Sequence, residues 1–364
     1  MASCFIAQKA NPGMTGVFSR PRTKIRMALI CLVIGSSVLF ARHLGAQAAD
    51  SAPAAQAPKP LTQVAAVVEQ EDKQTHNLGL LSTLTKTDFR LFDNGHEVPI
   101  QSFSAGMDRS RPIALWLIVQ CNMGIPDDQA SGFIRGKTQY LKPALRHLED
   151  DDLIGVAHWC EDGQAKIDVA PGTSVDAALQ GVETVLAAPA YLGHNAQADL
   201  ALWQMVQLVT KSSKAQTPAR LPVLLFLHGD FSGDQGTIDV RISNQILTDI
   251  TGNSGLVFGL GVGTKDQNAL ESMRSGGVAG HFVHNFCVKS GGQYYTTARP
   301  ELFAPTLDYI LSQLHLRYTL GFAPAKLDGK THDLRVELTK DAQKRFPKTT
   351  LRFRGEYVAS PPAQ

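Results

Sequence analysis

The chain has 364 residues, which is enough for one large domain or two modest ones. Hydrophobic residues make up 43% and charged residues 19%, the balance of an ordinary globular protein rather than a disordered one. The formal net charge is +2, and part of the positive charge sits at Arg20, Arg22, Lys24 and Arg26. The remainder is close to neutral and lacks the basic stripe of a nucleic-acid-binding surface, so we expect no nucleic-acid partner.

The first segment of the chain has the order of a secretory signal. The basic residues precede an apolar run, residues 27–41, and Ala46-Gln47-Ala48 follows. The run of about 15 residues is shorter than the about 20 of a membrane-spanning helix. We expect residues 1–48 to be a signal peptide and residues 49–60 an Ala- and Pro-rich linker, giving a periplasmic, secreted or surface protein. An uncleaved membrane anchor is the alternative.

Short strands are predicted next, over residues 61–109. Residues 64–68 are apolar and rich in β-branched types, and residues 88–92 alternate apolar and polar side chains. Asn94-Gly95 is a hairpin turn pair, and alternation resumes at Val98 and Ile100. These patterns predict a β-hairpin.

Between residues 110 and 315 strand-like apolar runs alternate with helical patterns. Strands are predicted at residues 113–119, 153–159, 165–169, 222–227 and 256–262. Helices are predicted at residues 129–148, 175–187, 198–210, 240–250, 267–273, 282–290 and 301–314, with Ser174 capping the second. Such alternation predicts an α/β fold, a doubly wound and mainly parallel sheet with helices on both faces.

Strands return after Leu314 and continue to residue 358, followed by a short tail, residues 359–364. The strand segments before and after the α/β region are each too small to bury a core alone. We therefore expect residues 61–109 and 316–358 to pair in one small β-sandwich, into which the α/β domain is inserted.

Several motifs resemble one family. The hairpin region carries Leu84-Thr85-Lys86-Thr87-Asp88-Phe89 and then Asp93-Asn94-Gly95. The C-terminal strands carry Tyr318-Thr319-Leu320-Gly321-Phe322-Ala323-Pro324, then Asp328-Gly329-Lys330-Thr331-His332 and Arg354-Gly355-Glu356-Tyr357. In order and spacing they resemble the VWFA-related proteins of acidobacteria, which implies a von Willebrand factor A-like domain. Gly259-Leu260-Gly261-Val262-Gly263 and Ser290-Gly291-Gly292-Gln293-Tyr294-Tyr295 fit its last strands.

The resemblance also implies where a metal-ion-dependent adhesion site would lie, and this sequence departs from that site. Gln120, Asn122 and Gly124 stand at the positions of D-x-S-x-S, Asn195 stands at the Thr position, and His228 at the later Asp position. No carboxylate remains unless Asp230 approaches, so Mg²⁺ loses its negative ligands. We expect no metal and no cofactor, and a single His with no C-x-x-C motif argues against zinc.

Loss of the metal leaves the crevice at the carboxyl ends of the strands, where ligands of α/β sheets usually bind. Trp159, Tyr191 and Phe231 are candidate aromatic anchors for a protein partner, although Trp159 is better explained as core. In the implied fold the strands ending at Cys121 and Cys160 are parallel neighbours. These two cysteines therefore form either a disulfide or a pair of small buried thiols.

An enzyme is the least supported class. Leu224-Leu225-Phe226-Leu227-His228-Gly229 resembles the oxyanion loop of an α/β-hydrolase, but no G-x-S-x-G elbow follows. The sequence therefore favours an exported, non-enzymatic module that binds an extracellular or periplasmic protein through the loops of the α/β domain. A structural scaffold that binds through the β-sandwich is the alternative. A membrane partner is expected only if the leader stays uncleaved.

Overall fold

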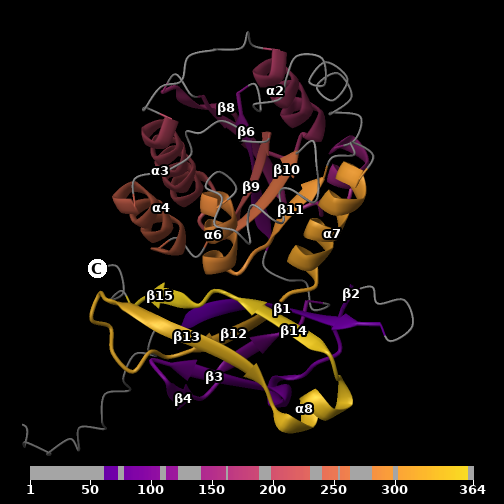
Figure 1. The fold of residues 1–364 in the computed structure, drawn as a ribbon, viewed down its shortest axis with the longest axis vertical. Coiled ribbons are helices and arrows are strands. Elements are labelled where there is room, and N and C mark those ends of the chain that lie inside the picture. Colours follow the sequence, from indigo (N-terminus) through magenta and orange to yellow (C-terminus); the bar gives the residue numbers. More distant parts are fainter. Residues whose placement is uncertain are drawn as a thin grey trace, which may run out of the picture. The chain divides into compact units, whose positions relative to one another are not determined.

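In the computed structural model, the structure describes residues 61–72, 78–106, 112–121, 141–160, 163–187, 198–229, 240–252, 255–262, 281–297 and 302–359. All of these residues belong to one compact unit, Ala57–Gln364. They form a six-stranded, mainly parallel sheet and two antiparallel sheets (Figure 1). None of the described helices is long and apolar enough to cross a bilayer.

The parallel sheet has the strand order β11-β10-β9-β6-β7-β8. Its strands are β6 (Ile113–Gln120), β7 (Leu153–Trp159), β8 (Ala165–Gly172), β9 (Leu221–Gly229), β10 (Leu256–Val262) and β11 (Tyr294–Thr297). Every residue of β6 is buried, as its unbroken apolar run predicts for a strand covered on both faces. Only β8 runs antiparallel to its neighbour, β7. This arrangement confirms the predicted mainly parallel α/β sheet.

Helices cover both faces of this sheet (Figure 1). One face packs against α2 (Val175–Ala187) and α7 (Phe303–His315), and residues 141–145 are also helical there. The other face packs against α3 (Ala198–Gln216), α4 (Val240–Gly252) and α6 (His281–Ser290). Ser174 caps α2 as predicted, because its Oγ accepts a hydrogen bond from the backbone N–H of Ala177 at 3.1 Å.

The antiparallel sheets combine the two ends of the described chain. One has the order β14-β1-β12-β5, with β2 also paired to β1, and the other has the order β15-β13-β3-β4. From the N-terminal side come β1 (Thr62–Glu71), β2 (Leu78–Leu80), β3 (Phe89–Asp93), β4 (His96–Val98) and β5 (Ser102–Ser104). From the C-terminal side come β12 (Tyr318–Phe322), β13 (Thr331–Leu338), β14 (Thr349–Phe353) and β15 (Glu356–Val358).

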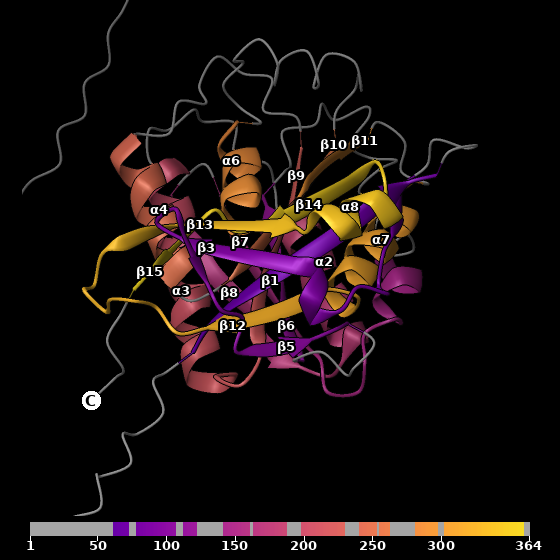
Figure 2. The same ribbon diagram turned by 90° about the horizontal axis from the view of Figure 1, so that it is seen from below.

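Figure 2 shows strands from opposite ends of the chain lying side by side, β1 with β12 and β3 with β13. One hydrophobic core joins the two antiparallel sheets, since Val64, Leu91, Leu320 and Val336 belong to the same buried cluster. Both terminal segments therefore contribute residues to this core. The turn at Asn94-Gly95 has positive φ at both residues, 47° and 79°, as the hairpin turn requires.

Two short helical elements were not predicted. The 3₁₀ turn η1 (Lys86–Asp88) occupies the first residue of the predicted 88–92 strand, so the strand begins at Phe89. Helix α8 (Lys340–Arg345) lies between β13 and β14 and is capped by Thr339, whose side chain accepts from the backbone N–H of Ala342. The helix predicted at residues 267–273 and most of that at 129–148 lie outside the described residues.

Candidate functional site

The carboxyl ends of the parallel strands meet at one edge of the sheet, and ligands of α/β sheets usually bind there. The candidate site lies at this edge. β6 ends at Gln120, and β7 ends at Trp159, with which Gln120 is in register. β9 ends with His228 and Gly229, and Leu227 is in register with Val119 of β6. The backbone of His228 therefore lies level with Gln120 on the adjacent strand. None of the described residues that end these three strands is a carboxylate.

Gln120 ends β6, and the sequence resemblance implies the first metal-binding Asp at its position. Its side chain is only 1% exposed, and the described residues provide no hydrogen bond to its Oε1 atom. A buried amide oxygen without a partner costs free energy, on the order of 1–3 kcal/mol. The amide is neutral, so it supplies an oxygen ligand to a cation but no charge to offset the cation's dehydration.

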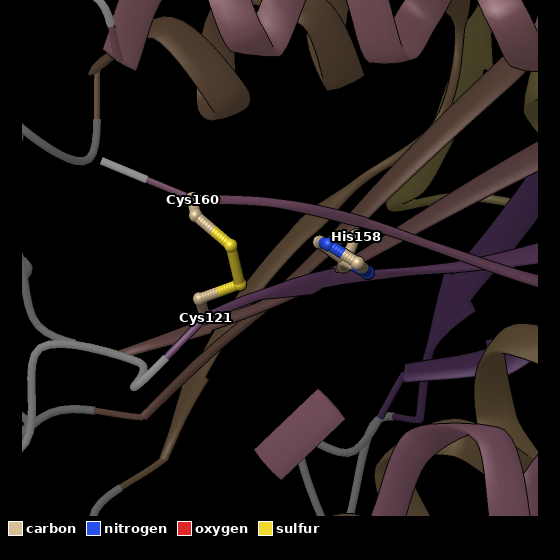
Figure 3. A group of neighbouring side chains, drawn as sticks. All are labelled: Cys121, His158 and Cys160. Atoms are coloured by element: carbon tan, nitrogen blue, oxygen red, sulfur yellow. A yellow bond between two sulfur atoms is a disulfide. The ribbon is translucent and has the colours of Figure 1, made fainter. Parts of the chain in front are cut away.

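Beside Gln120, Cys121 and Cys160 form a disulfide with a Cα–Cα distance of 4.9 Å (Figure 3). The backbone N–H of Cys121 also donates to the carbonyl oxygen of Trp159 at 3.0 Å, so pairing of β6 and β7 continues to this point. Cys160 opens the turn into β8, because its carbonyl oxygen accepts from the N–H of Gly163 at 3.1 Å. The disulfide thus ties together the two chain segments that leave the sheet edge.

His158 is the second-last residue of β7 and precedes Cys160 by two positions, so in extended backbone the two side chains point to the same side. Its Nδ1 is 2.7 Å from Oδ2 of Asp168 on β8, and both side chains are 13% exposed. The exposed Lys166 ammonium is 4.0 Å from the other carboxylate oxygen of Asp168. The sequence reasoning did not single out His158, although it is the one ionisable residue in the apolar strand Leu153–Trp159.

The other predicted site residues have different outcomes. Trp159 is 2% exposed and packs in the apolar cluster on the α3 face, so of its two interpretations the structure supports core and not an exposed anchor. Of His228, the structure describes the backbone. The remaining predicted positions lie outside the described residues: Asn122, Gly124, Tyr191, Asn195, Asp230 and Phe231.

A buried polar network, also missed from the sequence, joins α7 to the antiparallel sheets. The Glu69 carboxylate of β1 is 1% exposed and binds both terminal nitrogens of Arg352 from β14. The hydroxyl of Tyr309 on α7 donates to the same carboxylate at 2.5 Å. Burial, and then the adjacent Glu69 carboxylate, raise the pKa of Tyr309, so its hydroxyl stays protonated and donating.

A cavity of about 40 Å³ lies between the antiparallel sheet that contains β1 and β12 and the amino ends of β9 and β10. Its lining residues are Gln63, Ala65, Leu221, Leu256, Ser290, Arg317, Thr319 and Arg354. Arg354 donates to the carbonyl oxygen of Gln63 at 2.7 Å. Burial lowers the pKa of Arg354 to about 10, which still leaves the guanidinium charged at neutral pH. The cavity has room for a few water molecules around these polar groups.

The strand order and the helices on both faces define an open, doubly wound α/β sheet. No protein-family model matches the chain, and no curated protein matches it. Among solved structures, the chain is similar to a von Willebrand factor type A protein from Catenulispora acidiphila. The two share 10% identity with a TM-score of 0.41, covering 76% of this chain and 75% of that one.

Two further similar structures come from Bacteroides. An aerotolerance-related membrane protein from Bacteroides fragilis, carrying multiple mutations to serine, shares 12% identity with a TM-score of 0.39. The match covers 55% of this chain and 99% of that one. The conserved hypothetical protein BatB from Bacteroides thetaiotaomicron shares 13% identity with a TM-score of 0.39, covering 56% and 98% of the two chains.

Proposed function

We propose that this chain is an exported, non-enzymatic binding module. Its von Willebrand A-like domain, residues 110–315, is inserted into a β-sandwich formed by residues 61–109 and 316–358. The loops at the carboxyl ends of the parallel strands hold a protein partner by ordinary contacts, without Mg²⁺ and without a chemical step. The motif resemblance and the doubly wound sheet support this assignment of the domain.

The observation that carries the metal-free part is the residue at the end of β6. A hard divalent cation is held by carboxylate oxygens, and here the neutral Gln120 is buried at that position. Its neighbour in the adjacent strand is His228, whose imidazole is a ligand for softer metals than Mg²⁺. The described strand ends therefore offer no negative charge against the cost of stripping water from Mg²⁺.

The orientation of the sheet supports binding at this edge. Leu221 and Leu256, at the amino ends of β9 and β10, line a cavity together with Gln63 and Thr319 of the antiparallel sheet. The amino ends of the parallel strands thus face the antiparallel sheet, and the carboxyl ends face the other way. A partner that approaches the carboxyl-end loops therefore does not meet the antiparallel sheets.

Calorimetric titration of Mg²⁺ and Mn²⁺ into the purified protein, with a thermal melt at each concentration, tests the metal-free part. We expect no saturable heat and no shift of the melting temperature. Saturable binding that disappears in Gln120→Ala or His228→Ala would instead define a working metal site with unusual ligands, and the metal-free proposal would be wrong.

The binding part is tested by capture of envelope proteins on the immobilised protein. We expect Tyr191→Ala and Phe231→Ala to lose the captured protein. Leu208→Ala, on the exposed side of α3 at 39% exposure, is the matched control and keeps it. If capture survives both loop variants but is lost in Leu327→Asp, at an exposed leucine beyond β12, the scaffold function through the antiparallel sheets replaces the present proposal.

A further inference from the structure

Three potential metal ligands meet at the disulfide. The two Sγ atoms of Cys121 and Cys160 and one ring nitrogen of His158 all lie within 4.8 Å of one another. Figure 3 shows one edge of the imidazole facing the disulfide. The three residues are neither fully buried nor fully exposed, so each keeps some contact with solvent.

These distances are close to those of a zinc site. Bonds of about 2.0 Å to nitrogen and about 2.3 Å to sulfur place tetrahedral ligand atoms roughly 3.3–3.8 Å apart. The imidazole nitrogen and the sulfurs therefore need to approach by no more than about 1.5 Å. Once the S–S bond is broken, rotation about the Cα–Cβ bonds of Cys121 and Cys160 separates the sulfurs without moving the paired strands.

His158 contacts a carboxylate through one ring nitrogen, as metal-binding histidines commonly do. Nδ1 of His158 contacts the Asp168 carboxylate at 2.7 Å, which leaves Nε2 as the nitrogen for a metal. β7 lies between β6 and β8 in the sheet. Asp168 on β8 and Cys121, the residue after β6, therefore approach the imidazole from opposite sides, and the carboxylate does not occupy the place of the ion.

From this arrangement we propose a redox-gated metal site in which Cys121, Cys160 and His158 bind one Zn²⁺ ion when the disulfide is reduced. A dithiol reductant supplies two electrons and two protons, becomes a disulfide itself, and leaves two protein thiols. Zn²⁺ then binds both sulfurs as thiolates, and two protons pass to solvent. The fourth tetrahedral position is left to water or a bound group. A small-molecule disulfide re-oxidises the site: it takes two electrons from the thiolates and two protons from solvent, becomes two thiols, and leaves the Cys121–Cys160 disulfide. Two of the three protein ligands are then lost and the ion is released.

The test uses the full chain reduced with a phosphine, freed of reductant under nitrogen and titrated with Zn²⁺. We expect one zinc per reduced chain, about two protons released per ion in calorimetry across buffers, and no stoichiometric zinc on the oxidised chain. With Co²⁺ as the probe, a thiolate-to-metal charge-transfer band should appear only after reduction. Cys121→Ser and Cys160→Ser should each abolish that band.

His158→Ala keeps both cysteines of the disulfide. A thermal melt of the oxidised variant, compared with the oxidised wild type, therefore checks that the variant is folded before zinc is added. We expect it to bind zinc at least about tenfold more weakly, and Asp168→Asn about 10- to 100-fold more weakly. Cys287→Ala, at the buried free thiol, and His147→Ala, at a histidine 67% exposed, are the matched controls and should bind as wild type. Absence of stoichiometric zinc on the reduced chain, or zinc binding unchanged in His158→Ala, overturns the proposal.

Discussion

The ion pair between Glu69 and Arg352 gives the most demanding test of how this chain holds together. Arg352→Ala removes both charged hydrogen bonds to the Glu69 carboxylate, which stays buried because its side chain is 1% exposed. Breaking a buried pair from one side costs about 3–5 kcal/mol. The Arg352 side chain is 18% exposed and the Tyr309 hydroxyl still donates to the carboxylate, so we expect the lower end, about 3 kcal/mol.

Urea denaturation followed by circular dichroism measures this loss as a fall in the transition midpoint at unchanged slope. Lys348→Ala is the matched control, because Lys348, the residue before β14, pairs with Glu71 at the end of β1 but is 51% exposed. An exposed pair contributes at most about 1 kcal/mol. The double change Glu69→Gln with Arg352→Met should recover most of the loss, since no charge is left buried. If Arg352→Ala loses no more stability than Lys348→Ala, this reasoning is refuted.

Three further predictions concern stability. Burial raises the pKa of Asp152, but hydrogen bonds from a histidine side chain and two backbone amides outweigh it, and the net pKa is lowered. The stabilisation by ionised Asp152 is therefore fully present above the ordinary Asp pKa of about 3.9 and is lost as the pH falls through the lower pKa of the folded state. In urea melts from pH 6 to 3, the stability of Asp152→Asn should fall less with pH than that of the wild type. Gly292→Ala places a Cβ 1.9 Å from a backbone oxygen and should cost about 3 kcal/mol or more, whereas Gly252→Ala meets nothing within 4 Å and should be neutral in the same melts. Reducing the Cys121–Cys160 disulfide, which spans 39 residues, should cost about 4 kcal/mol in metal-free buffer on the chain-entropy model, and equal melts of the oxidised and reduced protein would contradict this.

Helices and strands could be predicted from the sequence where their residue pattern had a clear beginning and end. The predicted bounds of α2 and β10 match the structure, Val175–Ala187 and Leu256–Val262. Ser174 fixes the start of the helix through its cap, and the apolar run of β10 is flanked by glycines. α8 was missed because Lys340–Arg345 is almost wholly polar and has no apolar period. Thr339 was its available signal, a capping residue directly before good helix formers.

The contacts between segments far apart in the sequence could be predicted only in part. Pairing of the terminal strands follows from their small size, but the sequence does not set their register. Glu69 and Arg352 are 283 residues apart, and they meet because Val67 is opposite Arg352 in the β1–β14 pair. At the candidate site the residue types were readable, including the neutral Gln120. The burial of Trp159 and the His158–Asp168 contact depend on which face of β7 each side chain takes once β8 pairs with it.

The disulfide bears on how a site without Mg²⁺ would keep its shape. A bound ion holds separate loops together by taking ligands from each of them, and binding surfaces gain affinity when their loops are ordered in advance. In this chain Cys121 and Cys160 join the segments that leave β6 and β7 at the same edge of the sheet. A covalent bond between those two segments supplies one of the connections that an ion would make, and it does so without a negatively charged ligand. On the proposed function, reduction of the disulfide should therefore weaken partner binding even under conditions where the sheet stays folded.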